Sequence, residues 1–126
     1  MNLQGNEIEE NLQRFNGSET LYTFPLIRTC YTEGMKYLAT AAGAHWLITD
    51  TSVVAKSLMD KSPFITVDFK RLPKGGHDYS GYLAVIDYSD GNGNVFETHR
   101  YNVTDFPLEE LRMFFVDGTL MLPGEY

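Results

Sequence analysis

Four side chains have the chemistry to act as nucleophiles, bases or metal ligands: Cys30, His45, His77 and His99. Cysteine catalysis needs a neighbouring base, so Cys30 with His45 or His99 is the minimal pair to consider. The sequence around Cys30 lacks the glycine-flanked turn that presents a nucleophile in many hydrolases. A free cysteine is more often a small buried apolar residue, and we favour that interpretation.

The three histidines do not have the spacing that places two metal ligands on one helix face. The best candidate pair for a metal or general-base site is His77-Asp78, because a carboxylate beside an imidazole can orient it. This pair lies in a glycine-rich stretch that predicts a turn, where adjacent side chains usually point apart. We therefore predict no metal site and no cofactor.

A second candidate metal site is a possible calcium loop, formed by Asp87, Asp90, Asn92 and Asn94. Counting from Asp90, the sixth position is Val95, where the loop needs glycine for its sharp turn. The twelfth position is Tyr101, where a bidentate glutamate is required. The same residues are typical of a hairpin turn, because asparagine and glycine tolerate positive φ.

Tyrosines form the remaining group of functional candidates. A sheet face rich in aromatic residues can stack on nucleic-acid bases, but such binding also needs a basic groove, which the sequence does not offer. Packing within a sheet, with surplus tyrosines in a protein interface, is the stronger interpretation. The predicted interface residues are Tyr79, Tyr82, Tyr88 and Tyr101.

Length and composition limit what these residues can build. The 126 residues fit one domain, residues 1–126, and a hydrophobic fraction of 43% supplies its core. The formal charge of −7 repels phosphate backbones and anionic membrane surfaces. One cysteine excludes an internal disulfide, and neither a secretion signal nor an apolar run of about 18 residues is visible. We expect a cytoplasmic protein without a direct nucleic-acid or membrane partner.

The first half of the chain predicts three helices. Ile8, Leu12 and Phe15 predict a short helix that ends at Asn16-Gly17. Thr32 can cap a second helix, whose end is marked by Gly43. Residues 44–58 favour a third helix, although Thr49, Thr51 and two adjacent valines weaken helix propensity. A strand over residues 44–49, followed by a helix capped by Asp50, is the competing interpretation.

From Pro63 the apolar period changes to two. Ile65 to Phe69, Tyr82 to Tyr88 and Val95 to Val103 are three alternating runs. Turns at residues 74–76 and 90–94 separate them, so the three strands should form an antiparallel meander.

The C-terminal region predicts one more helix. Thr104 or Asp105 can cap it, Pro107 suits its first turn, and residues 117–118 can end it. Residues 119–122 then form a fourth strand or an extended tail. The apolar side chains of this region predict that it belongs to the core. The predicted fold class is α+β, with helices packed on one face of a small antiparallel β-meander.

Three stretches of the chain resemble a family of small bacterial proteins known only as a domain of unknown function. The stretches are Phe15-Asn16-Gly17-Ser18-Glu19, Gly43-Ala44-His45-Trp46-Leu47 and the C-terminal region from Thr104-Asp105-Phe106-Pro107-Leu108 to Leu122-Pro123-Gly124-Glu125-Tyr126. Where this family ends in Leu-Pro-Ser-Glu-Tyr, this chain has Gly124. The resemblance implies an accessory protein of phages, plasmids or other mobile elements that modulates a host or competing protein. It assigns no catalytic residue.

The sequence thus predicts a non-enzymatic binding or modulator protein that acts on another protein, and it also allows a homo-oligomer. Two alternatives stay open. An acidic inhibitor could imitate nucleic acid, which needs rows of carboxylates at phosphate spacing. A small enzyme or ligand-binding protein could use Cys30 or a histidine, which needs a pocket with converging polar groups.

Overall fold

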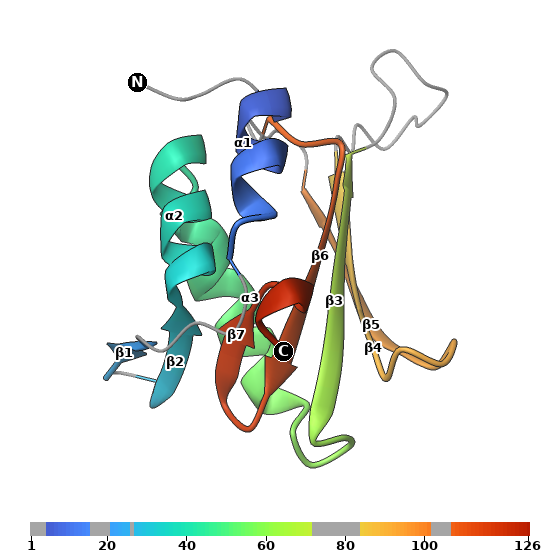
Figure 1. The fold of residues 1–126 in the computed structure, drawn as a ribbon. Helices are drawn as coiled ribbons and strands as arrows, with labels where there is room; N and C mark the ends of the chain where they lie inside the picture. Colours follow the sequence, from blue (N-terminus) through green and yellow to red (C-terminus); the bar gives the residue numbers. More distant parts are fainter. Residues whose placement is uncertain (1–4, 16–20, 26, 72–83, 102–106) are drawn as a thin grey trace, which may run out of the picture.

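The computed structural model describes residues 5–15, 21–25, 27–71, 84–101 and 107–126. Within these residues the chain forms three α-helices, one short 3-10 helix and seven β-strands (Figure 1). The helices are α1 (Gly5–Leu12), α2 (Glu33–Ala42), α3 (His45–Ser57) and the 3-10 helix η1 (Pro123–Glu125). The strands are β1 (Leu21–Phe24), β2 (Thr29–Thr32), β3 (Phe64–Arg71), β4 (Ala84–Ser89), β5 (Val95–Tyr101), β6 (Glu110–Val116) and β7 (Thr119–Met121).

The strands form one sheet in the order β1-β2-β7-β6-β3-β4-β5. Neighbouring strands are antiparallel except β2 and β7, which pair in parallel. The three α-helices lie on one side of the sheet (Figure 1). The fold is therefore α+β with its helices on one face, as predicted, and the sheet extends well beyond the predicted meander.

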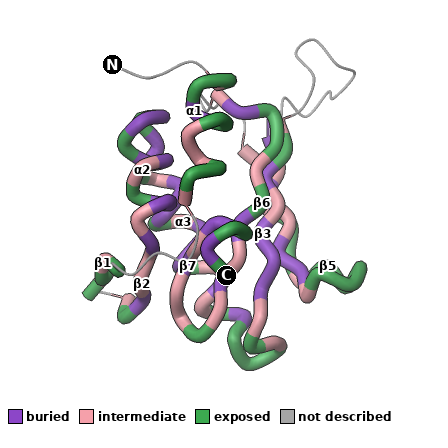
Figure 2. Tube along the Cα trace, viewed as in Figure 1, coloured by how far each residue is buried: buried purple, intermediate pink, exposed green. Residues whose placement is uncertain are grey.

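Strand alternation builds the core between the sheet and the helices. Ile65, Val67 and Phe69 of β3 point toward the helices and are almost fully buried. Their neighbours across the sheet, Phe115 on β6 and Tyr88 on β4, are buried on the same side. Figure 2 shows buried residues on the central strands and on the helices behind which the core lies, and α2 and α3 contribute Leu38, Ala39, Leu47 and Ile48. Each such large side chain stabilises the fold by about 1.5–3 kcal/mol before chain entropy is counted.

The predicted ends of α2 are confirmed. The Thr32 hydroxyl accepts a hydrogen bond from the Met35 backbone amide at 3.4 Å, which satisfies one of the free amides of the first turn. Gly43 adopts the left-handed conformation with φ of 64°, and Ala44 N–H donates to Ala39 C=O at 2.8 Å. These two bonds fix the direction in which the chain enters and leaves the helix.

Residues 45–57 form the single helix α3, so the competing strand-plus-helix interpretation is wrong. Leu47, Ile48 and Ala55 are buried. The free energy gained by burying these side chains on one side of α3 outweighs the low helix propensity of its threonines and valines. The Thr51 hydroxyl also donates to Leu47 C=O at 2.6 Å, which gives this polar group a partner inside the helix layer.

The predicted meander is confirmed by the antiparallel pairing of β3 with β4 and of β4 with β5. The predicted turn at residues 90–94 joins β4 to β5, with positive φ at Gly91 and Gly93. The Asp90 carboxylate accepts hydrogen bonds from the Asn92 backbone at 2.7 Å and the Asn94 side chain at 2.7 Å. These bonds lower the pKa of Asp90. The other predicted turn, at residues 74–76, lies outside the described residues.

The predicted C-terminal helix is wrong, because residues 110–116 form strand β6. Its proposed caps, Thr104 and Asp105, lie outside the described residues. Leu111, Met113 and Phe115 share the core face of the sheet with β3, and Phe114 lies on the opposite face. Apolar side chains therefore occur on both faces of β6, which is expected for a strand in the middle of a sheet. The β-propensity of residues 110–116 therefore favours a strand over the predicted helix.

Two more strands, β1 and β2, occupy a region in which the sequence predicted no regular structure. Residues 119–121 return to the sheet as β7, which inserts between β2 and β6. Leu120 and Leu122 are buried, so the prediction that the C-terminal residues belong to the core is confirmed. Pairing of β2 with β7 is a long-range contact, which a local reading of residues 29–32 could not reveal.

Glu125 ties the C-terminal segment to the start of α2. Its carboxylate is buried and accepts hydrogen bonds from the Thr32 hydroxyl at 2.6 Å and from the backbone amides of Gly34 and Leu122 at 3.0 Å each. A Cβ atom at Gly34 would lie 2.5 Å from a Glu125 carboxylate oxygen, so only glycine allows this approach. A negative charge beside the helix N-terminus is also favoured by the helix dipole.

Candidate protein-interaction surface

The side of the sheet that faces away from the helices carries the candidate site, and we call it the open face. No helix in the described parts of the chain covers it (Figure 1). Because opposite residues of neighbouring strands share a face, the register identifies its members. On strands β3 to β6 they are Phe64, Thr66, Asp68, Lys70, Val85, Asp87, Ser89, Thr98, Arg100, Glu110, Arg112, Phe114 and Val116.

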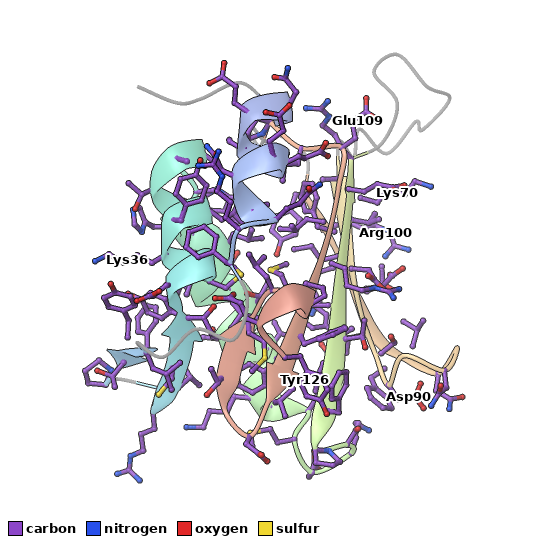
Figure 3. The ribbon with its side chains drawn as sticks, viewed as in Figure 1. Lys36, Lys70, Asp90, Arg100, Glu109 and Tyr126 are labelled. Atoms are coloured by element: carbon purple, nitrogen blue, oxygen red, sulfur yellow. The ribbon has the colours of Figure 1, made fainter. Side chains whose placement is uncertain are left out.

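Charged residues occupy two neighbouring rows of the open face. One row runs Glu110, Lys70, Val85, Arg100 across β6, β3, β4 and β5, and the next runs Arg112, Asp68, Asp87, Thr98. In Figure 3 the Lys70 and Arg100 side chains project away from the helices on the same side of the sheet. Three basic and three acidic side chains make these rows formally neutral, in contrast to the charge of −7 on the whole chain.

The ion pair between Arg112 and Asp68 is bidentate. Arg112 Nε donates to one Asp68 oxygen at 2.7 Å, and Arg112 Nη2 donates to the other at 3.2 Å. Hydrogen bonding to Asp68, together with its charge, raises the pKa of Arg112. On the next strand Asp87 accepts a 2.7 Å hydrogen bond from the Thr98 hydroxyl. These bonds hold Asp68 and Asp87 in place although like charges directly opposite each other repel.

A shallow hollow of about 440 Å³ lies over the charged rows and is lined by Lys70, Val85, Asp87, Glu110 and Arg112, among others. A second hollow, of about 450 Å³, lies beside the end of α1 and is lined by Leu12, Phe15, Leu122 and Pro123. Glu110, Leu111 and Arg112 line both hollows, so the two adjoin at β6.

Three aromatic rings form an apolar cluster at the other end of the open face: Phe64, Phe114 and Tyr126, which we call the aromatic cluster. The ring centres of Phe64 and Phe114 are 4.8 Å apart, and Tyr126 packs edge-on against Phe64 at 5.2 Å and Phe114 at 5.9 Å. Tyr126 nevertheless remains 72% exposed. The labelled Tyr126 ring lies beside β3 and η1 in Figure 3. Ring packing therefore holds a large exposed apolar side chain in one orientation.

A different cluster lies between α3 and the β4–β5 edge of the sheet. The Tyr101 ring packs against Trp46 with ring centres 5.4 Å apart. Burial, the charge of Asp50 and a hydrogen bond to Asp50 raise the pKa of Tyr101 to about 12. Tyr88 is fully buried, and no described residue hydrogen-bonds to its hydroxyl. Burial, followed by the charges of Tyr101, Asp50 and Glu97, raises the pKa of Tyr88 far above its usual value.

The structure places only part of the predicted catalytic set. His99 Nε2 lies 2.9 Å from a Glu97 carboxylate oxygen, and its ring meets the edge of Tyr88 at 5.4 Å. Cys30 lies on β2, and four strands separate β2 from β5 in the sheet. At about 4.8 Å per strand, Cys30 is on the order of 24 Å from the strand of His99. The structure therefore excludes a pair between Cys30 and His99.

No contact described for Cys30 joins it to His45, which begins α3 and is exposed. His77 and Asp78 lie outside the described residues. Among the residues that the structure describes, no group of three His, Cys, Asp or Glu side chains could hold a metal ion. The described helices also include none that is long and apolar enough to cross a membrane.

Of the four tyrosines predicted to form an interface, Tyr79 and Tyr82 lie outside the described residues. Tyr88 shares the core face with Ala84 and Ile86 and is 0% exposed, so it cannot contact a partner in this fold. This part of the prediction is corrected by strand alternation, which already placed Tyr88 in phase with two apolar residues. Tyr101 is half-buried against Trp46 and presents only part of its ring.

The residues that sequence reasoning missed are those of the open face, above all Phe64, Phe114 and Arg112. A period of two over residues 110–116 was the available signal, since it puts Arg112 and Phe114 on one face and Leu111 and Met113 on the other. Assignment of this region to a helix concealed that signal.

Comparison with known proteins agrees with the resemblance seen in the sequence. No curated protein and no solved structure matches the chain. The family described as "Family of unknown function (DUF6876)" matches residues 6–126, which is nearly the whole sequence. The chain therefore belongs to the DUF6876 family.

Proposed function

We propose that the chain is a non-enzymatic binding protein whose open face docks against another protein in the cytoplasm. One observation carries the proposal: the aromatic cluster holds Tyr126, 72% exposed, in a fixed position beside a patterned polar surface. Aromatic residues and arginine are enriched at protein interfaces, and tyrosine is frequent among the residues that contribute most to binding. Because Tyr126 is already packed on two rings, it loses little side-chain entropy on binding.

The charged rows support specific recognition of a protein partner. Acidic and basic side chains are mixed there in a fixed pattern, so a partner needs the complementary pattern to avoid leaving charges unpaired. This arrangement favours a protein interface over nucleic-acid mimicry, since Lys70 and Arg112 lie opposite Glu110 and Asp68 within the two rows. A mimic of a duplex needs uninterrupted rows of carboxylates.

The enzyme alternative has less support. Its nucleophile, Cys30, lies far from His99, and no described contact gives it a base. The Glu97–His99 pair is its best remaining element, because a carboxylate can orient an imidazole for proton transfer. Neither the hollow over the charged rows nor the hollow beside α1 is lined by His99 or Cys30.

In this proposal the partner is a host or competing protein that the chain modulates. Support comes from the family resemblance described above, which implies an accessory protein of phages, plasmids or other mobile elements. The partner's surface should carry an apolar pocket for Tyr126 and charges that complement the rows beside it.

The test compares three tagged proteins in affinity capture from an extract of the native host: the unchanged chain, Tyr126→Ala and Val53→Ala. Val53 is a matched control because it is 47% exposed and apolar but lies on α3, on the helix side of the fold. A partner retained by the unchanged chain and Val53→Ala, but lost by Tyr126→Ala, supports the proposal. Hydrogen exchange should then show protection of β3 and β6 in the purified complex.

A His99→Ala variant separates binding from catalysis. If the chain is a binding protein, this variant retains the partner and the biological activity. Loss of a true general base lowers a rate by about 10²–10⁴-fold. A folded His99→Ala variant without activity, beside a fully active Tyr126→Ala variant, would overturn the proposal in favour of an enzyme.

A further inference from the structure

Strand β5 is the last strand of the sheet and has β4 as a neighbour on one side only. No strand in the described parts of the chain pairs with its other side. It contains seven residues, whereas β1 at the opposite edge contains four. A free edge presents backbone donors and acceptors to another strand, and short edges are the less available ones. The longer edge is therefore the better template for an added strand.

The regular part of β5 is also in the right place to pair. The register with β4 shifts between Tyr88 and Ser89, which puts the bulge near Val95 and Phe96. From Glu97 to Tyr101 the pairing with β4 is continuous. Glu97, Thr98 and Arg100 are exposed, and Val95 is 53% exposed, so side chains at this edge are accessible as well.

The sequence of β5 is complementary to itself in one register. When two copies run antiparallel with the two Thr98 residues opposite each other, Glu97 of each copy faces His99 of the other. These two side chain types already meet within the chain, where His99 Nε2 is 2.9 Å from Glu97. A carboxylate and an imidazole directly across antiparallel strands can share a hydrogen bond, and such cross-strand polar pairs are stabilising.

The bulge near Val95 and Phe96 limits the regular contact between the two copies to residues 97–99, which include both Glu97–His99 pairs. One glutamate and one arginine make β5 formally neutral, so two chains with a charge of −7 can approach here with little local repulsion.

We propose that two copies of this chain associate through β5, antiparallel about a two-fold axis at Thr98, to form one continuous sheet. The axis is perpendicular to the sheet, because directly opposite residues of antiparallel strands share a face. Both open faces then lie on the same side of the joined sheet. The dimer goes beyond the proposed binding function and does not depend on it.

Disulfide cross-linking tests the register. In a Cys30→Ser background, which removes the single native cysteine, Thr98→Cys places one thiol on the axis. Directly opposed antiparallel residues have Cα atoms about 4.5–5.5 Å apart. That separation lies within the reach of a disulfide. Mild oxidation should convert the Thr98→Cys protein to a covalent species of twice the mass.

Two cysteine controls share this background. Thr23→Cys lies on β1, the other edge strand, and Arg100→Cys lies on the same face of β5 but away from the axis. Both should form no covalent dimer under the oxidation that links Thr98→Cys. Equal linking at Thr23 would show random collision and overturn the proposal, and preferential linking at Arg100 would overturn the register.

A charge exchange tests the Glu97–His99 contact without cysteines. Glu97→Lys removes the carboxylate that faces His99 of the other copy. Sedimentation over a range of concentrations should then show a shift from dimer to monomer. Adding His99→Glu to Glu97→Lys should restore the dimer. An unchanged chain that is monomeric throughout, or a dimer insensitive to Glu97→Lys, would refute the proposal. Tyr126→Ala should leave the dimer intact, so failure of the binding function and failure of the dimer are distinguishable.

Discussion

The Thr32 hydroxyl donates a 2.6 Å hydrogen bond to the Glu125 carboxylate, although 93 positions separate the two residues in the sequence. The same hydroxyl accepts from the Met35 amide and so caps α2. A single threonine therefore serves the helix start and the C-terminal segment at once. The N-cap and the docking of η1 form one hydrogen-bond network, in which each member supports the others.

Replacing Glu125 with alanine should destabilise the fold by about 3 kcal/mol, because the buried Gly34 and Leu122 amides lose their acceptor. Denaturant unfolding measures this change. Glu109→Ala is the control. The Glu109 side chain is 86% exposed, and its carboxylate forms a surface ion pair with Arg71 at 3.9 Å. Surface ion pairs contribute about 0–1 kcal/mol to stability. Equal stability of the two variants would contradict the network.

Replacing Tyr88 with phenylalanine should leave the melting temperature unchanged or raise it. The hydroxyl is buried without a hydrogen-bond partner in the part of the chain that the structure describes, and an unsatisfied buried group costs about 1–3 kcal/mol. The matched variant Tyr101→Phe removes the hydrogen bond to Asp50 and should lower stability by about 1 kcal/mol. Marked destabilisation by Tyr88→Phe would show that its hydroxyl has a partner in solution.

Stability should fall as the pH rises from 10 to about 12. The pKa of Tyr101 is raised from 10.0 in the unfolded chain to about 12 in the fold, so the unfolded state loses its proton first. The stabilisation is complete below pH 10 and is lost through this window, and Tyr88 acts in the same direction. Unfolding curves across this range test the point, and Tyr101→Phe should reduce the slope. A slope that Tyr101→Phe leaves unchanged would contradict the assignment.

Calcium should not bind the turn at residues 90–94. Both Asp90 carboxylate oxygens already accept hydrogen bonds from Asn92 and Asn94, so a metal ion would have to displace them. Calorimetric titration with calcium should release no heat. A site of micromolar affinity at this turn would show that the hairpin hydrogen bonds are exchangeable for metal ligands.

Local signals predicted the elements that local interactions determine. The cap at Thr32, the stop at Gly43 and the β4–β5 turn each depend on residues close in sequence, and all three were predicted correctly. Strand β2 was missed because its partner β7 lies far along the chain. No nearby residue could signal that pairing.

The error at β6 has a more specific cause, and it also concealed the candidate site. An acidic start after Pro107 imitates a helix N-terminus. The aromatic cluster puts Phe114 on the open face, so four apolar residues follow one another over residues 113–116 and blur the period of two. The surface proposed to bind a partner is thus the feature that made its own strand hard to recognise.

Strand β7 also sets the order in which the molecule can assemble. Its three residues are the only link in the described sheet between the β1–β2 hairpin and the other strands. The chain between Cys30 and Thr119 must close into a long loop before these two residues can pair. Closing the loop costs conformational entropy before the pairing contributes any stabilisation. We expect β3 to β5 and the helices to form early and β7 to dock after the rate-limiting barrier. Leu120→Ala should then accelerate unfolding and hardly alter the folding rate, which makes the shortest strand of the sheet the determinant of the protein's lifetime in the folded state.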